Sequence, residues 1–283
     1  MKTLFLISFC VLKCYCIAFA QYPPEFKGSN YGNNPKAGRY ADIRGFKMYY
    51  EVYGKGEPLL LIHGNSGSLN NFTGQISFFA QSYQVIAVDS RAHGKSVDPT
   101  DSLSYQMMAD DFNALLDYLK IKSCYVIGWS DGGNIGLLLA IHYPGKIKKL
   151  ASTGANIWID KRAFPGDMLA APNEMIDSLR KLPPSPAIKN AIKVWNLINQ
   201  EPGISIEQLN SIKCQVLIIG GDHDVILPKH AVLIAENIPL SNLWILPNSG
   251  HSTLINYKNL FNNTVNTFFK KPYRIIKGWD QLN

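Results

Sequence analysis

The sequence predicts an α/β fold in which a mostly parallel eight-stranded sheet carries helices on both faces and a small helical cap. Two kinds of segment in the sequence support this prediction. Short apolar or β-branched runs of strand length alternate with longer stretches whose apolar residues recur at helical spacing. Such an alternation of continuous apolar strands with helices is typical of a parallel sheet buried on both faces. The expected strands cover residues 39–43, 46–52, 58–63, 83–89, 123–129, 147–153, 214–220 and 243–246.

The first two expected strands form an antiparallel pair that turns at Gly45, and helices are expected between the later strands. The clearest helix places Met108, Phe112 and Leu119 at helical spacing. Ser104 precedes this helix and is a residue type that caps helix N-termini. The other expected helices cover residues 69–80 and 134–142, and a last one carries Phe261, Val265 and Phe268.

One long segment departs from the alternation. Between residues 156 and about 208 no strand pattern occurs, and Ile188, Ile192 and Trp195 share one helical face. An insertion of about 50 residues between two sheet strands is long for a connection and indicates a functional segment. We therefore expect residues 21–283 to form a single domain, with a helical cap inserted at about 156–208.

Residues 1–20 have the pattern of a cleavable export signal. Lys2 supplies the positive charge, residues 4–12 are nearly all apolar, and residues 18–20 (Ala-Phe-Ala) form a small-x-small cleavage site before Gln21. The apolar run is shorter than the roughly 20 residues that cross a bilayer. The sequence thus predicts an exported protein, periplasmic or secreted, with no stable membrane span after cleavage. The alternative is an uncleaved leader that holds the protein at a membrane.

The charge balance gives no indication of a nucleic-acid partner. The formal charge of +7 falls to +5 on cleavage, because the leader contains two lysines and no acidic residue. An excess this small is typical of a mildly basic solvated surface. We therefore expect no nucleic-acid partner.

Two cysteines, Cys124 and Cys214, would remain after cleavage, each at the start of an apolar strand-like run. We expect both to be buried free thiols, although an exported protein could also form a disulfide. No CxxC occurs outside the leader and no HExxH occurs, so no metal site and no cofactor are predicted. The histidines without metal-ligand spacing, expected to be structural or exposed, are His63, His93, His142, His223 and His230.

The most informative motif is Gly-Trp-Ser-Asp-Gly at residues 128–132. It matches GxSxG and lies between an expected strand and an expected helix, which is the context of a nucleophile elbow. The sharp turn exposes the serine, and glycine at positions 128 and 132 removes Cβ atoms that would collide there. The sequence therefore predicts Ser130 as a nucleophile.

An acid and a base follow in the order that this arrangement requires. Asp224 lies just beyond the strand at 214–220, and His251 lies just beyond the strand at 243–246. Both therefore belong to the carboxyl edge of the sheet, where Ser130 also lies. His251 would accept the serine proton and Asp224 would orient the imidazole. Asp222 is the alternative acid.

Acyl transfer also needs hydrogen-bond donors for the oxyanion. One candidate is the backbone N–H of Asp131, directly after the nucleophile. The other is the backbone N–H of Asn65, in the glycine-rich loop after the third expected strand. That loop could instead be a turn without catalytic contact.

Five runs resemble the α/β-hydrolase superfamily in order and spacing: residues 59–64, 89–96, 128–133, 221–228 and 250–251. The resemblance covers about residues 39–270, and the form Gly-Trp-Ser-Asp-Gly-Gly is similar to the biphenyl hydrolase-like (valacyclovir hydrolase) branch of esterases. In that family the acid is the second Asp of a G-x-x-D turn, which implies Asp224. The chain departs from the family pattern at Ala92, where glycine is usual, and we expect an altered turn there.

The resemblance and the three candidate residues imply a serine hydrolase. The leading expectation is cleavage of a carboxylic ester or related acyl bond of a small molecule through an acyl-serine intermediate. The alternatives are C–C bond hydrolysis or perhydrolysis with a similar triad, and a noncatalytic binding protein on the same fold. Related dehalogenases and epoxide hydrolases use an aspartate nucleophile, so Ser130 argues against both.

Overall fold

An eight-stranded sheet forms the centre of the computed structural model, which describes residues 30–200 and 202–282. Its strands are β1 (Gly38–Ile43), β2 (Phe46–Tyr53), β3 (Glu57–Ile62), β4 (Tyr83–Val88), β5 (Cys124–Trp129), β6 (Ile147–Thr153), β7 (Gln215–Gly221) and β8 (Ser241–Leu246). They lie in the order β1-β2-β4-β3-β5-β6-β7-β8. Every neighbouring pair from β4 to β8 is parallel, whereas β2 is antiparallel to both β1 and β4.

The strands agree with the predicted runs to within one residue at each end, except that β8 begins two residues earlier, at Ser241. The antiparallel β1–β2 pair is confirmed. Its turn consists of Arg44 and Gly45, which both have positive φ, 43° and 89°. A two-residue hairpin whose central residues both have positive φ matches the twist of the strands that it joins.

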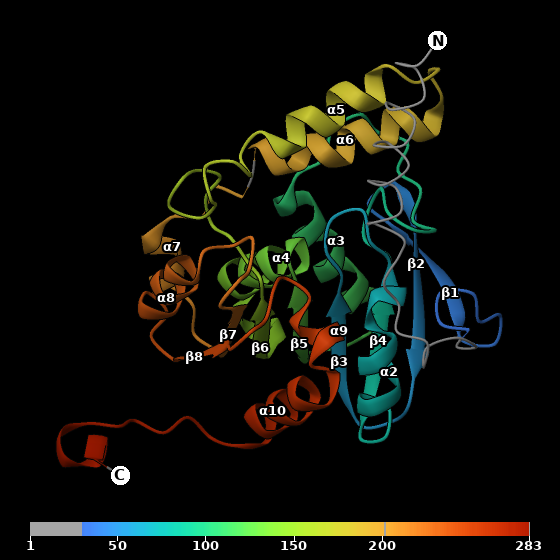
Figure 1. Cartoon of the computed structure of the whole chain (residues 1–283). Coiled ribbons are helices and arrows are strands. Elements are labelled where there is room, and N and C mark those ends of the chain that lie inside the picture. Colours follow the sequence, from blue (N-terminus) through green and yellow to red (C-terminus); the bar gives the residue numbers. More distant parts are fainter. Residues whose placement is uncertain (1–29, 201, 283) are drawn as a thin grey trace.

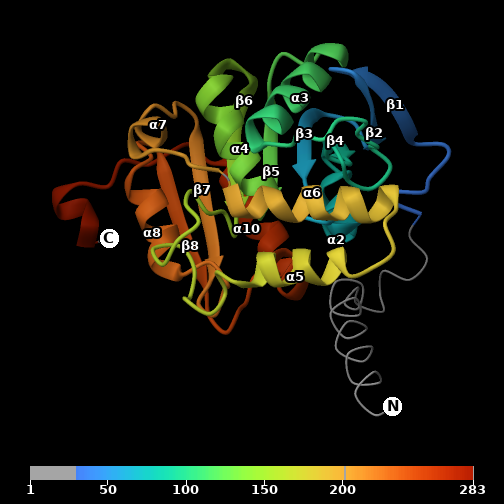
Figure 2. The ribbon, with the colours of Figure 1, turned by 90° about the horizontal axis from the view of Figure 1, so that it is seen from above.

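Helices cover both faces of the sheet (Figures 1 and 2). One core packs α3 (Tyr105–Tyr118), α4 (Asp131–His142) and α8 (Pro228–Glu236) on one face, and a second core packs α2 (Thr73–Phe79) and α10 (Lys258–Lys270) on the other. Successive side chains of a strand point to opposite faces of the sheet and so pack into different cores. In β3, Leu60 and Ile62 pack into the first core, and Leu59 and Leu61 pack into the second. Outside residues 156–208, the other short helices of the described residues are η2 (Leu69–Phe72), η3 (Pro144–Lys146), α9 (Thr253–Asn256) and η4 (Gly278–Leu282).

The predicted N-cap of α3 is confirmed, because the Ser104 side chain accepts a hydrogen bond from the Met107 amide at 3.1 Å. The sequence analysis missed α8. Pro228 stands at its first turn, where proline is favoured, and the helix buries Ala231 and Ile234. In the last helix, α10, the fully buried aromatic residue near the end is Phe269 and not Phe268.

Between β6 and β7 the chain forms α5 (Ala171–Arg180), α6 (Pro186–Gln200) and α7 (Ile206–Asn210), and the described residues there contain no strand. The first two helices lie side by side above the sheet (Figures 1 and 2). Ile176 and Leu179 of α5 and Val194 and Leu197 of α6 are buried. The helical insertion expected at 156–208 corresponds to this segment, and its role as a cap stays a prediction.

Ala92, the departure from the family pattern, lies in a turn with φ 64°. This left-handed conformation is unstrained for glycine and costs a residue with a Cβ atom about 1–2 kcal/mol. The Ala92 carbonyl accepts a hydrogen bond from the α6 residue Asn190 at 2.8 Å. Alanine at this position therefore adds backbone strain to the turn, and a difference from the turn of the family stays a prediction.

Both cysteines of the described chain are buried and free, as predicted. Burial raises the pKa of Cys124 to about 12 and that of Cys214 to about 11. Of the helices within residues 30–200 and 202–282, none combines the length and the apolarity that a bilayer crossing needs. The predicted leader at 1–20 and the cleavage before Gln21 lie outside the described residues.

Candidate active site

Ser130 stands on a sharp turn between β5 and α4, with φ 56° and ψ −119°. A positive φ is strained for serine and persists only where the surroundings hold it. Here the Ser130 N–H donates to the Thr153 carbonyl at the end of β6, at 2.8 Å. Its own carbonyl accepts from the amides of Gly133 and Asn134, at 2.8 and 3.1 Å. The end of one strand and the start of one helix thus hold the serine in this conformation.

The close approach of backbones around Ser130 requires glycine at several positions. A Cβ atom on Gly128 would collide with the Gly132 carbonyl, and one on Gly132 would collide with the Ile62 carbonyl, as the sequence analysis expected. A Cβ atom on Gly64 would lie 2.9 Å from the Ser130 Cβ. The loop after β3 is therefore packed directly against the candidate nucleophile.

His251 and Asp224 are paired through a 2.7 Å hydrogen bond between Nδ1 and Oδ1. A carboxylate only accepts hydrogen bonds, so Nδ1 carries the proton and Nε2 is left with a lone pair. The Ile226 amide also donates to Asp224 Oδ1, at 3.0 Å. The Asp224 side chain is 1% exposed and that of His251 is 24% exposed. The acid is therefore fixed in the interior, while the imidazole reaches the surface of the site.

The alternative acid, Asp222, has a different set of partners. It accepts hydrogen bonds from the backbone amides of Asn248 and Ser249, both at 2.9 Å, and lies 2.8 Å from the His223 Nδ1. The bonds from Ser249, His223 and Asn248 hold the pKa of Asp222 well below its usual range. Asp222 thus fastens the loop that precedes His251, and it is Asp224 that contacts the imidazole.

Two residues that the sequence analysis did not single out place the His251 ring. A Cβ atom on Gly154, which follows β6 and has φ 64°, would lie 2.7 Å from the His251 Cε1. The Trp129 indole N–H donates to the His251 carbonyl at 3.0 Å. Gly154 directly follows Thr153, the residue that binds the Ser130 amide, so consecutive residues at the end of β6 contact the candidate nucleophile and lie beside the candidate base.

His63, expected to be structural, fastens the loop after β3. Its Nδ1–H donates to the Gly64 carbonyl at 2.7 Å, and its Nε2 accepts from the Ser90 amide at 3.0 Å. Burial lowers the pKa of His63 to about 4, so the ring is neutral at pH 7 and this tautomer is the one that satisfies both contacts.

The two candidate oxyanion residues are joined through their side chains. The Asn65 Nδ2 donates to the Asp131 Oδ2 at 3.0 Å and to the Val194 carbonyl of α6, also at 3.0 Å. The loop after β3 therefore contacts both the residue after Ser130 and the helical insertion. This contact also shows that α6 lies over the carboxyl end of β3.

The Asp131 carboxyl is an unusual titratable group for this position, because the residue is only 5% exposed. Burial raises its pKa to about 6, although hydrogen bonds from Tyr105 and Asn65 and the nearby His251 act in the opposite direction.

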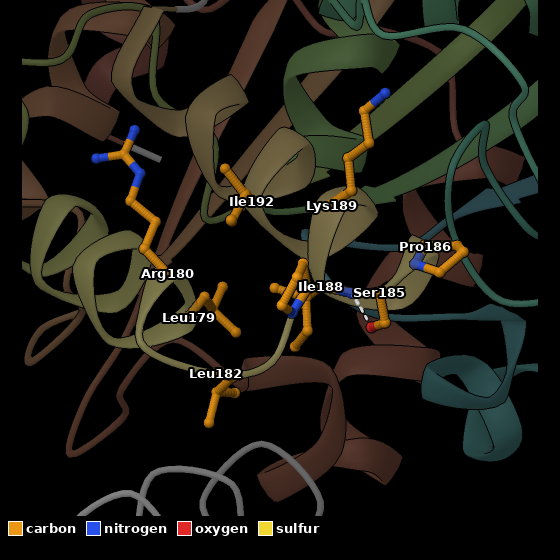
Figure 3. Close-up of a pocket in the computed structure, with 9 residues that line it drawn as sticks. Leu179, Arg180, Leu182, Ser185, Pro186, Ile188, Lys189 and Ile192 are labelled. Atoms are coloured by element: carbon orange, nitrogen blue, oxygen red, sulfur yellow. Dashed lines mark hydrogen bonds between the residues drawn. The ribbon is translucent and has the colours of Figure 1, made fainter.

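Two surface hollows lie on the helical insertion. The larger, of about 850 Å³, is at the turn between α5 and α6 and is shown in Figure 3. The Ser185 hydroxyl accepts from the Ile188 amide at that turn, at 3.2 Å. The second, of about 400 Å³, lies between α6 and residues 98–101. Neither is lined by Ser130, Asp224 or His251.

No group of three His, Cys, Asp or Glu side chains in the described part of the chain is arranged to hold a metal ion. A hydroxyl on a strained turn, an oriented imidazole and a buried carboxylate are the components of a nucleophile that a neighbouring base activates.

Comparison with known proteins identifies relatives of this chain. The family described as alpha/beta hydrolase fold matches residues 57–184. The mouse serine hydrolase BPHL is 27% identical over 246 residues, which cover 81% of this chain and 84% of that protein. The 3-oxoadipate enol-lactonase 2 of Acinetobacter baylyi is 27% identical over 250 residues, covering 79% of this chain and 93% of that protein.

Solved structures show the same fold. An esterase from Exiguobacterium antarcticum has a TM-score of 0.72 at 25% identity and covers 83% of this chain and 100% of its own. Est816, described as an N-acyl homoserine lactone degrading enzyme, has a TM-score of 0.70 at 26% identity, covering 81% and 100%. The chain has the fold of the α/β-hydrolase superfamily. Within it, the sequence resembles the biphenyl hydrolase-like serine hydrolases.

The contact between Gly154 and the imidazole makes a testable prediction. Gly154→Ala should displace the His251 ring and lower kcat for an ester by about 100-fold, the effect expected of a displacement near 1 Å. Gly203→Ala is the matched control, because Gly203 also has positive φ, 57°, but has no atom within 4 Å of its added Cβ. Both variants should lose about 1–2 kcal/mol of stability. Equal kcat values in the two variants would contradict the role of Gly154 in placing the His251 ring.

Because the Asp131 carboxyl is buried, we expect it to make the free energy of unfolding depend on pH. A carboxyl whose pKa is raised on folding stabilises the fold below the unfolded pKa, and this contribution is lost as pH rises through the folded value of about 6. Asp131→Asn removes the titration, so the urea-measured stability of the variant relative to wild type should increase by about 2 kcal/mol from pH 4 to pH 8. Asp42→Asn, at an 83% exposed side chain, is the control and should show no such trend. A flat difference for Asp131→Asn would refute the prediction.

Proposed function

We propose that this protein is a serine hydrolase that cleaves a carboxylic ester or a related acyl bond of a small molecule through an acyl-serine intermediate. The observation that carries the proposal is the His251–Asp224 pair, which lies at the same sheet edge as a serine held at positive φ. The relatives, which include an esterase and two lactone-cleaving proteins by name, support the acyl-bond class.

In the proposed mechanism the Ser130 hydroxyl attacks the acyl carbon and gives its proton to the His251 Nε2. Asp224 holds the Nδ1 proton and stabilises the imidazolium that forms. The backbone N–H groups of Asn65 and Asp131 donate to the negative oxygen of the tetrahedral intermediate. The leaving alcohol takes the proton from His251, and a water molecule, activated by the same imidazole, then releases the acid from Ser130.

The proposal makes a prediction that separates the two candidate acids. Asp224→Asn should lower kcat by about 10³–10⁴-fold, because an amide no longer stabilises the imidazolium or its tautomer. Asp222→Asn is the matched control, since Asp222 contacts the loop before His251 and not its ring. We expect it to reduce kcat by less than about tenfold. The measurement is p-nitrophenol release from a short-chain ester.

A fluorophosphonate probe tests the nucleophile directly. The wild-type protein should be labelled, and Ser130→Ala should abolish both labelling and ester hydrolysis. A panel of esters, amides, lactones and a diketone-like substrate, run with Ser130→Ala as the control, separates acyl hydrolysis from C–C bond hydrolysis. A folded wild-type protein that is not labelled would support a noncatalytic binding protein instead.

Export belongs to the same proposal and rests on the sequence pattern of residues 1–20. N-terminal sequencing of the protein recovered outside the cytoplasm should begin at Gln21. A sequence that begins at Met1 in the membrane fraction would favour a retained leader, and absence from every exported fraction would contradict export.

A further inference from the structure

Polar contacts hold helix α6 against residues 92–100, which belong to the loop that follows β4. The Lys193 ammonium binds the Asp98 Oδ2 at 2.7 Å and donates to the Thr100 carbonyl at 2.6 Å. One helical turn earlier, Asn190 donates to the Ala92 carbonyl at 2.8 Å. These contacts fix where the helix lies relative to the loop that follows β4.

The Lys193 contact belongs to a buried charge network. The side chains of Lys193, Asp98 and Arg91 are 11%, 0% and 3% exposed, and the Arg91 Nη1 binds the other oxygen of Asp98 at 3.0 Å. Arg91 continues to Asp111 of α3, at 2.6 Å. Charges buried to this degree need their partners, so removing one member leaves another unpaired in the interior. Lys193 is therefore a specific attachment point of α6.

The Asn65 side chain connects this seated helix to the candidate oxyanion loop. Its amide orientation is defined by its neighbours: Oδ1 accepts from the Ser66 hydroxyl at 2.8 Å, and Nδ2 faces two acceptors. One acceptor is the Val194 carbonyl, in the residue next to Lys193, and the other is the Asp131 carboxyl. Both protons of the amide are used, one on each side of the site.

We propose that Lys193 and the side chain of Asn65 are positioning residues. They fix the positions of the oxyanion donors by tying the loop after β3 to helix α6. Lys193 holds the helix, the Val194 carbonyl holds the Asn65 amide, and the amide holds the loop against the residue after Ser130. The inference rests on the proposed function, because it assigns the Asn65 and Asp131 backbone N–H groups to the oxyanion.

The expected consequence is specific to the chemical step. Oxyanion donors act only when they are aimed at the developing charge, and small displacements remove much of their effect. The loop is also strained, since Ser66 has φ 54°, so it depends on its contacts to keep its conformation. Loss of the contacts that hold α6 on the loop after β4 should therefore lower kcat for a small ester with little change in KM.

The chain offers a matched pair of lysines for the test. Lys193→Met should lower kcat for p-nitrophenyl acetate by about tenfold, with KM within about twofold of wild type. Lys189, one turn earlier on α6, binds Asp101 at 2.7 Å, but the two side chains are 70% and 76% exposed. Lys189→Met should leave kcat within about twofold, because exposed ion pairs contribute little. Equal kcat values for the two variants would overturn the proposal.

A double-mutant cycle tests whether Lys193 acts through Asn65. Asn65→Ala keeps the backbone N–H but removes the amide, and should by itself lower kcat by about tenfold. In that background Lys193→Met should cost less than about threefold more, since the contact that it controls is already absent. A full tenfold loss in both backgrounds would overturn the role of Asn65. If Lys193→Met does not fold, a wild-type kcat in Asn65→Ala alone would overturn it equally.

The failure of this inference is distinguishable from the failure of the proposed function. If Ser130→Ala abolishes fluorophosphonate labelling while Lys193→Met and Asn65→Ala keep wild-type kcat, the hydrolase proposal stands and the positioning role is wrong. If Ser130→Ala keeps full hydrolysis, the nucleophile itself is wrong.

Discussion

The hydrogen bond from the Ser130 amide to the Thr153 carbonyl joins the ends of β5 and β6, and the candidate site is arranged around it. It holds the serine at positive φ, and the next residue, Gly154, abuts the His251 ring. The carboxyl edge of a parallel sheet supplies this arrangement, because adjacent strands end together there. A shift in the pairing of β5 with β6 would therefore move the serine, and the space for the imidazole, at the same time.

Much of the fold was predictable because its elements depend on local patterns. Strands such as β3 are continuous apolar runs, and the GxSxG motif fixes a turn that only glycine permits at residue 132. Contacts between distant segments were not predictable. The preference for Asp224 over Asp222 came from a family resemblance, whereas the structure distinguishes them by which one contacts His251. The contact of Gly154 with that ring has no local pattern at all.

The missed features have the same origin. Helix α8 is short, with nine residues, and begins at Pro228. The contact from Asn65 to the Val194 carbonyl joins residues 129 positions apart, and it involves a backbone acceptor that any residue type would supply. Composition and spacing cannot reveal such a contact. Asn65 was proposed for its backbone N–H, and only the structure revealed what its side chain binds.

The burial of Cys124 and Cys214 has a practical consequence. Thiols with pKa values of about 12 and 11 are almost wholly protonated at pH 7.5, and the protonated form is the unreactive one. A cysteine introduced at an exposed site on the outer side of α5 or α6 would therefore react with maleimides far faster than either native thiol. A fluorophore or spin label attached there would report on the helical insertion while Cys124 and Cys214 remain in place.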